Sequence, residues 1–260
     1  MTMKRMVLVW VMIMCLCTVS LPVNAEGPLD WLFSLFAEPN QSQEAVGMTH
    51  AETVTAFRGL GIDVPDETVL DVEQSLADMN SQMAQYGFTR DEQPWDFPLM
   101  LLGRLGSGEY NYDTDIWTAT SSDVYAFDAE VFNISHMYAL FLQGVSSIVP
   151  GFDCTDVTEV IDEWSEAEIA AKGLLAGGAE GTTTVRFTLN GHIYERQLAF
   201  YGDWFDTAAI DWINEVLTAE GYDGQLCAFS DGGQGLILFY GDEARFEQLQ
   251  RVIAQPPWGF

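Results

Sequence analysis

Basic side chains are scarce in this 260-residue chain, which has 10 Lys and Arg residues against 39 Asp and Glu residues. The formal net charge of −29 repels nucleic acid and anionic membrane surfaces, so neither is an expected partner. A disordered acidic tail is excluded as well, because 48% of the residues are hydrophobic and 13% are aromatic. We therefore expect the acidic groups to lie on the surface of a folded protein that has a hydrophobic core.

Long hydrophobic runs are absent except at the N-terminus. Lys4 and Arg5 precede the apolar run Met6–Val19, and small residues around Ala25 match a signal peptidase site. An uncleaved anchor is the alternative, but the run is shorter than the roughly 20 residues that a bilayer core needs, and Pro22 breaks it. We therefore expect a signal peptide over residues 1–25, cleavage after Ala25, and a secreted or extracytoplasmic protein.

Cleavage would make the chain more acidic and leave it without a transmembrane segment. Removing Lys4 and Arg5 leaves 8 basic against 39 acidic residues, a formal charge of −31 over 235 residues. This length suits one large domain or two small ones. The expected partner is a protein or a component of the cell envelope.

Cysteine is also scarce, since only Cys154 and Cys227 of the four cysteines would remain after cleavage. In an oxidising compartment this pair predicts a disulfide, which could add about 4 kcal/mol of stability by closing a long loop. Two buried thiols are the alternative. The sequence leaves both open.

The region 26–150 is predicted to be mostly helical. Thr49 and Glu52 match a capping box that opens a short helix, and apolar residues recur at helical spacing over Pro65–Gly87. Further helices are expected over Trp95–Leu105 and from Met137 to Val145, the latter capped by Asn133 or Ser135, with one strand near 124–131.

The region 151–260 predicts an α+β unit with two hairpins and two helices. Asn190-Gly191 predicts a type I′ turn that pairs Phe187 with Tyr194. A second hairpin joins Gln225–Phe229 to Leu236–Tyr240. Asp206 and Asp242 are expected to cap the helices that follow the two hairpins, and a further helix is expected over Glu159–Lys172. The β-β-α-β-β-α order predicts a four-stranded antiparallel sheet with its helices on one face.

Asn111, Asp113 and Asp115 place oxygen-bearing side chains at alternate positions, as at the start of a calcium loop. The sixth position of that loop, Ile116, should be glycine, and the twelfth, Ser122, should be glutamate. These three residues are therefore only weak candidates for calcium. A polar turn leading into a strand is the favoured interpretation.

Nucleophilic catalysis has no matching motif in the chain. Its mature part would contain only His50, His136 and His192, and neither Cys154 nor Ser107 lies in a known nucleophile pattern. A cysteine or serine hydrolase is therefore not expected.

Paired carboxylates are harder to dismiss. Asp128 and Glu130 fall on one face of the predicted strand, and two such groups across a groove suffice for glycoside hydrolysis. Pairs of this kind also arise by chance in so acidic a chain. The favoured hypothesis is thus a non-catalytic exported binding module, with a carboxylate-based hydrolase acting on glycan as the alternative and a calcium-stabilised module third.

Overall fold

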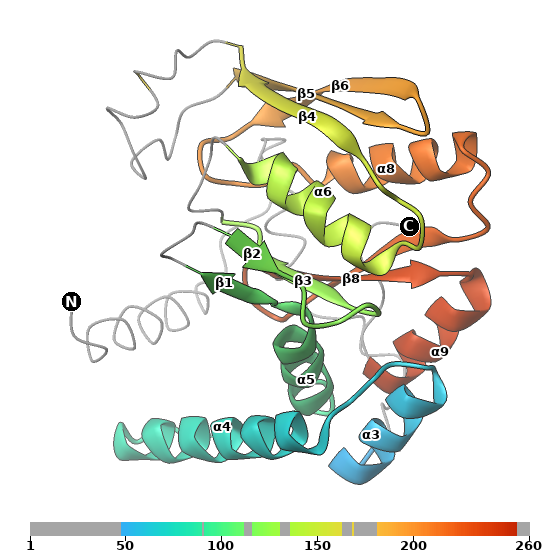
Figure 1. The fold of residues 1–260 in the computed structure, drawn as a ribbon. Coiled ribbons are helices and arrows are strands. Elements are labelled where there is room, and N and C mark those ends of the chain that lie inside the picture. The colour runs from blue at the N-terminus through green and yellow to red at the C-terminus, as the bar shows by residue number, and fades with distance from the viewer. Residues whose placement is uncertain are drawn as a thin grey trace, which may run out of the picture. The chain divides into compact units, whose positions relative to one another are not determined.

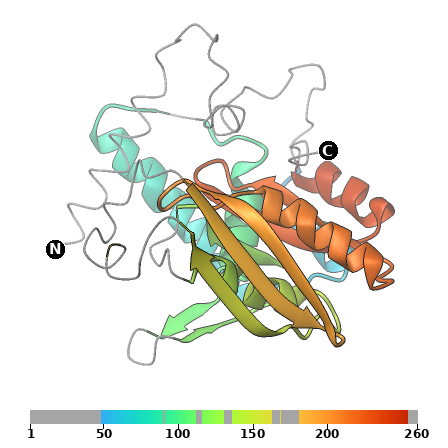
Figure 2. The same ribbon diagram turned by 90° about the horizontal axis from the view of Figure 1, so that it is seen from above.

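The computed structural model describes residues 48–89, 91–111, 116–130, 136–162, 168 and 181–253 (Figures 1 and 2). All of them belong to one compact unit, Glu38–Phe260. The predicted signal peptide lies outside the described residues. The fold is of mixed α and β type. No helix in the described ranges is long and apolar enough to cross a membrane.

Three helices form the first part of the described chain, close to their predicted positions. They are α3 (His50–Gly59), α4 (Asp66–Gln85) and α5 (Asp96–Gly106). The capping box predicted for α3 is present, because the Thr49 side chain accepts the Glu52 N–H and the Glu52 carboxylate accepts the Thr49 N–H.

Three later helices are α6 (Met137–Ile148), α8 (Ala208–Ala219) and α9 (Glu243–Ile253). At the start of α8, Asp206 Oδ1 accepts the Ala208 N–H at 3.0 Å, and at the start of α9, Asp242 Oδ1 accepts the Arg245 N–H at 2.9 Å. Asp242 therefore stands at the predicted cap of α9, whereas the N-cap of α8 is Thr207 and Asp206 bonds the first residue of the helix from one position earlier. For α6, the predicted caps Asn133 and Ser135 lie outside the described residues.

The first hairpin belongs to an outer sheet of order β4-β5-β6, formed by β4 (Thr155–Ile161), β5 (Gly181–Leu189) and β6 (His192–Phe200). The predicted register is confirmed, with Phe187 opposite Tyr194. Positive φ angles of 52° at Asn190 and 82° at Gly191 fit the type I′ turn.

The predicted helix over Glu159–Lys172 is wrong at its start, because β4 continues to Ile161 and pairs with β5. Its β-branched residues Val157, Thr158, Val160 and Ile161 suit a strand, and the neighbouring strand supplies the hydrogen bonds that decide between strand and helix. Of residues 163–180, only Glu168 is described.

The second hairpin belongs to a different, central sheet of order β3-β8-β7. Its strands are β3 (Tyr125–Asp128), β7 (Gln225–Ser230) and β8 (Gly235–Gly241). The predicted four-stranded sheet is therefore wrong, since each hairpin instead adds a third strand from earlier in the chain. The reason lies in β7 and β8, whose residues are buried on both faces. Other elements must therefore pack against both faces of their sheet.

The elements lie in layers (Figure 1). The outer sheet comes first, followed by α6 and α8, the central sheet, and then the group α3, α4, α5 and α9. One buried cluster fills the space around α6 and α8 between the sheets, and a second lies between the central sheet and the other helices. Both clusters draw residues from either side of position 150, where the predicted helical region 26–150 meets the predicted α+β region 151–260.

A short hairpin completes the described elements. It consists of β1 (Glu109–Asn111) and β2 (Ile116–Thr118), which pair antiparallel with Asn111 opposite Ile116. Trp117 on β2 joins this hairpin to the end of α5, because its Nε1–H donates to the Ser107 carbonyl at 2.9 Å.

Candidate functional site

The weak calcium candidates fall at the β1–β2 hairpin. Asn111 is the last residue of β1 and is exposed, whereas Asp113 and Asp115 lie outside the described residues. Within the described ranges, no group of three or more His, Cys, Asp or Glu side chains could hold a metal ion. Calcium binding by Asn111, Asp113 and Asp115 stays a prediction.

Cys154 and Cys227 are free thiols in this structure. Cys227 is fully buried in the cluster between the central sheet and α3, α4, α5 and α9, whereas Cys154 packs against the cluster around α6 and α8. Burial raises the pKa of the Cys227 thiol to about 12 and also raises the pKa of Cys154. Neither thiol is activated for nucleophilic attack.

His50 ties the start of α3 to two other segments. Its Nδ1 lies 3.1 Å from Glu73 Oε1, its Nε2 lies 2.7 Å from Glu92 Oε1, and its ring stacks on Phe97 with centroids 3.8 Å apart. Burial lowers its pKa, but the two carboxylates outweigh that effect and the pKa is raised. Both ring nitrogens are occupied, so His50 fits a structural tie better than a general base.

The carboxylate pair Asp128 and Glu130 lies where β3 ends. Asp128 Oδ1 accepts the Glu130 N–H at 2.9 Å, and Glu130 Oε2 accepts Gln234 Nε2–H at 2.8 Å. Desolvation raises the pKa of Asp128, and the nearby carboxylates of Glu130 and Asp231 add to this effect. Glu130 also forms an isolated β-bridge with Trp204. Two acids and a tryptophan thus lie in one neighbourhood.

Glu220 at the end of α8 gathers three side chains of the β5–β6 hairpin. Its carboxylate accepts hydrogen bonds from Tyr194 Oη, from Asn190 Nδ2 at 2.9 Å and from His192 Nδ1 at 2.7 Å. These bonds lower the pKa of Glu220 to about 2, so the group is ionised at neutral pH. The cluster contains a His–carboxylate pair, but within the described part of the chain no serine or cysteine bonds to His192. The Glu220 cluster therefore joins the β5–β6 hairpin to the end of α8.

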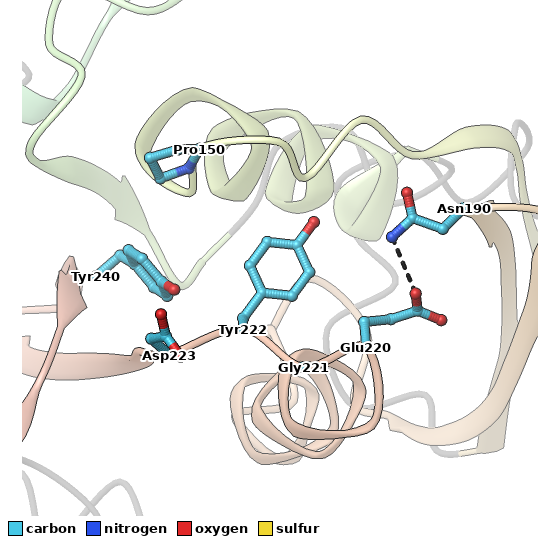
Figure 3. A pocket seen from close by; sticks show the side chains of 7 residues that line it. All are labelled: Pro150, Asn190, Glu220, Gly221, Tyr222, Asp223 and Tyr240. Carbon is cyan, nitrogen blue, oxygen red and sulfur yellow. Dashed lines mark hydrogen bonds between the residues drawn. The ribbon is translucent and has the colours of Figure 1, made fainter.

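An open cavity of about 500 Å³ lies beside Glu220 (Figure 3). Figure 3 shows the rings of Tyr222 and Tyr240 and the carboxyl group of Asp223 at this cavity. Residues from four separate segments meet here, and these include Pro150, Asn190, Glu220, Tyr222, Asp223 and Tyr240.

Glu159 on β4 provides the cap that α6 lacks. Its Oε2 accepts the N–H groups of Tyr138 at 3.0 Å and Ala139 at 3.2 Å, whereas the residue at the N-cap, His136, makes no side-chain cap. Its Oε1 is buried without a hydrogen-bond partner among the described residues. Burial raises the pKa of Glu159 to about 7.

Exposed apolar side chains occur on α4 and just after its end. Three of the seven exposed large apolar residues of the described chain lie on α4 or directly after it. They are Leu70, Tyr86 and Phe88, which are 65%, 60% and 48% exposed. The opposite face of α4 buries Val72 and Leu76.

Comparison with family models, with curated proteins and with solved structures yields no match for this chain. Its function must therefore be inferred from the groups described above. The sequence pattern pointed to Asp128 and Glu130 but missed Glu220, Glu159 and the cavity. Their partners come from strands and helices far apart in the sequence, which no local spacing reveals.

Proposed function

We propose that the mature chain is an exported, non-catalytic module that binds another protein through α4. One observation carries this proposal. Leu70, Ala77, Ser81, Ala84 and Phe88 recur at steps of seven, four, three and four residues and are all exposed. At about 100° per residue, the first four positions fall in one line along α4, and Phe88 follows three residues after the helix ends at Gln85. We call these five residues the α4 stripe.

The composition of the α4 stripe suits a helix of the partner. Ala77, Ser81 and Ala84 are small, so the backbone of a second helix can come close. Leu70 and Phe88 stand at the two ends and offer apolar area that binding would remove from water. Phe88 follows the helix, and its N–H donates to the Met83 carbonyl at 3.0 Å, which holds it against the last turn. An amphipathic helix fits such a surface.

The charge of the chain indicates the character of that partner. Five acids lie on α4, and the helix has no basic residue. Asp66, Asp71 and Glu73 already pair with Arg58, Arg104 and His50, whereas Glu67 and Asp78 form no ion pair among the described residues. A partner helix with basic residues beside its apolar line is therefore favoured over an acidic one. Such charges would speed association more than they would tighten it.

Two substitutions at neighbouring exposed positions test the proposal. Ser81→Arg places a long side chain on the α4 stripe, whereas Gln82→Arg adds the same side chain and charge about 100° away. The mature protein and both variants would serve as bait for the host's own envelope fraction, with recovered proteins identified by mass spectrometry. We expect one specific protein that the parent and Gln82→Arg capture and that Ser81→Arg does not. If all three baits capture the same protein equally, the α4 stripe is not the binding surface.

A second candidate, the carboxylate-based hydrolase acting on glycan, is favoured by one observation. Asp128, with its raised pKa, lies near the Glu130 and Asp231 carboxylates, as a general acid in a carboxylate site would. The mature protein would be incubated with soluble glucan and chitin oligosaccharides, and new reducing ends would be measured. Hydrolysis would be established if the parent forms new reducing ends, Asp128→Asn abolishes this activity and the exposed control Asp211→Asn preserves it. No release by the parent would leave the binding module as the proposal.

A further inference from the structure

We propose that the cavity beside Glu220 binds an organic cation, a guanidinium or alkylammonium group. The cavity lies between the end of α8, the β5–β6 turn and β8, and its residues are not those of the α4 stripe. Neither proposal depends on the other. Three features of the cavity carry the inference: fixed aromatic walls, uncompensated negative charge and an open mouth.

The aromatic walls are held in place before any ligand arrives. The Tyr222 hydroxyl donates to the Gly151 carbonyl at 2.7 Å, and the Tyr240 hydroxyl accepts the Gly224 N–H at 3.0 Å. The Tyr240 ring also packs onto Gly224 so closely that a Cβ there would lie 2.7 Å from a ring carbon. A side chain at this glycine would push the ring away. Rings fixed in this way bind at a lower entropic cost than mobile ones.

The charges around the two rings are negative. Glu220 is ionised and lies at one side of the cavity, and Asp223 lies at the other (Figure 3). A third carboxylate, Asp153, is close enough to act electrostatically on Tyr222. Asp223 is exposed and makes no hydrogen bond or ion pair within the described part of the chain. Its carboxylate is available to a ligand.

No basic side chain of the described residues pairs with Asp223 or Asp153, and Glu220 meets only His192. Arg245 comes near β8, but its guanidinium donates to the Tyr240 backbone carbonyl and lies 4.0 Å from Asp123. The cavity therefore keeps its negative charge.

Aromatic faces beside carboxylates attract cations. A guanidinium can stack on a tyrosine ring and bond a carboxylate with its planar fork, and an alkylammonium uses the same two groups less directionally. An anion would be repelled. A bare metal ion lacks its ligand set, because no group of three suitable side chains occurs in the described ranges. The cavity volume of about 500 Å³ leaves room for a whole arginine or lysine side chain.

The probe that tests this site is N-acetyl-arginine methylamide, with its uncharged isostere N-acetyl-citrulline methylamide as control. Both would be titrated into the full mature protein, and ¹H–¹⁵N NMR would follow the backbone amides. We expect the arginine probe to shift saturably the amides of Gly221, Asp223 and Gly224. We expect the citrulline probe to bind roughly fivefold or more weakly. N-acetyl-lysine methylamide distinguishes an ammonium from a guanidinium as the preferred group.

Matched variants distinguish binding at the cavity from attraction by the overall negative charge of the protein. Asp223→Asn should weaken the arginine probe roughly threefold, whereas Asp211→Asn, the same change on the exposed side of α8, should leave its affinity unchanged. Tyr222→Leu should weaken binding of the arginine probe roughly fivefold. Tyr222→Phe keeps the ring but loses the hydroxyl bond to Gly151, so it should weaken binding less than Tyr222→Leu does. Equal binding of the citrulline probe, or shifts spread evenly over the acidic surface, would overturn the proposal.

Discussion

The outer sheet and the central sheet differ in how they are held. The central sheet is buried on both faces, and its strands β7 and β8 each contain four consecutive buried residues. The outer sheet buries one face and exposes the other, where Val160 and Ile193 are 56% and 59% exposed. Apolar contact on two faces holds the central sheet. The outer sheet has apolar contact on one face only, and hydrogen bonds to Glu159 and Glu220 join it to α6 and α8.

This difference places the pH sensitivity of the fold at the outer sheet. Glu159 joins β4 to the start of α6, and Glu220 joins the β5–β6 hairpin to the end of α8. Burial raises the pKa of the first and hydrogen bonds lower the pKa of the second. One attachment should weaken as the pH rises and the other as it falls, whereas the apolar strands β7 and β8 of the central sheet should be indifferent between pH 5 and pH 8.

The largest expected effect is a loss of stability from the central sheet. Phe239→Ala removes a fully buried ring from β8 and should lower the free energy of unfolding by about 3 to 5 kcal/mol. Urea denaturation followed by tryptophan fluorescence measures it, and the loss should be the same at pH 5 and pH 8. A loss below about 1 kcal/mol would show that the central sheet is not the two-sided core described above.

The next effect concerns Glu159, whose folded pKa of about 7 exceeds its ordinary value of 4.5. Because the folded state binds this proton more tightly, Glu159 stabilises the fold below about pH 4.5 and this contribution is lost as the pH rises through 7. Glu159→Gln keeps an oxygen acceptor for α6 and removes the charge. It should raise the free energy of unfolding at pH 8 by about 3 kcal/mol, with little change at pH 4. A gain that is equal at both pH values, or equalled by the exposed Glu195→Gln, would contradict this cause.

A smaller effect of opposite pH dependence is expected at Glu220. Its folded pKa of about 2 lies below the ordinary 4.5, so its contribution is present above about pH 4.5 and disappears as the pH falls toward 2. Glu220→Gln should cost about 1 to 2 kcal/mol at pH 7, because one ionised acceptor of three hydrogen bonds is lost. Thermal melts of Glu220→Gln and of Glu215→Gln, an exposed acid on the same helix, measure it. Equal melting temperatures for the two variants would refute the role of Glu220.

The smallest effect is expected on the exposed face of the outer sheet. Ile193→Thr keeps a β-branched side chain and exchanges only solvent-facing atoms, so stability should change by no more than about 0.5 kcal/mol. Urea denaturation of this variant beside Phe239→Ala gives the contrast between the two sheets. A loss above about 2 kcal/mol would mean that this face is covered.

Local patterns were enough to predict most elements but not their assembly. The capping box at Thr49 and Glu52 and the turn at Asn190-Gly191 depend on neighbours in the sequence, and both are confirmed. The choice of sheet for each hairpin depends on β3 and β4, which pair across more than 20 intervening residues, and it was predicted wrongly. The continuous apolar runs of β7 and β8 were the available signal of a sheet covered on both sides.

The same limit applies to the candidate sites. Glu159 acts on Tyr138 from another element, and Glu220 meets Asn190 from 30 positions away. Without the fold, each was one acid among 39. By contrast, the α4 stripe could have been seen in the sequence as a line of small and apolar residues, but only the structure shows that its face is the exposed one.

Site-specific photo-crosslinking in the native host tests the proposed binding surface most directly. Benzoylphenylalanine would replace Ser81, at the centre of the α4 stripe, or Gln82, the residue beside it, which is also exposed. Irradiation should give one discrete adduct with another protein from position 81 and far less from position 82. No adduct at either position, equal adducts at both, or an adduct only with a second copy of this chain would contradict the proposal that α4 binds another protein.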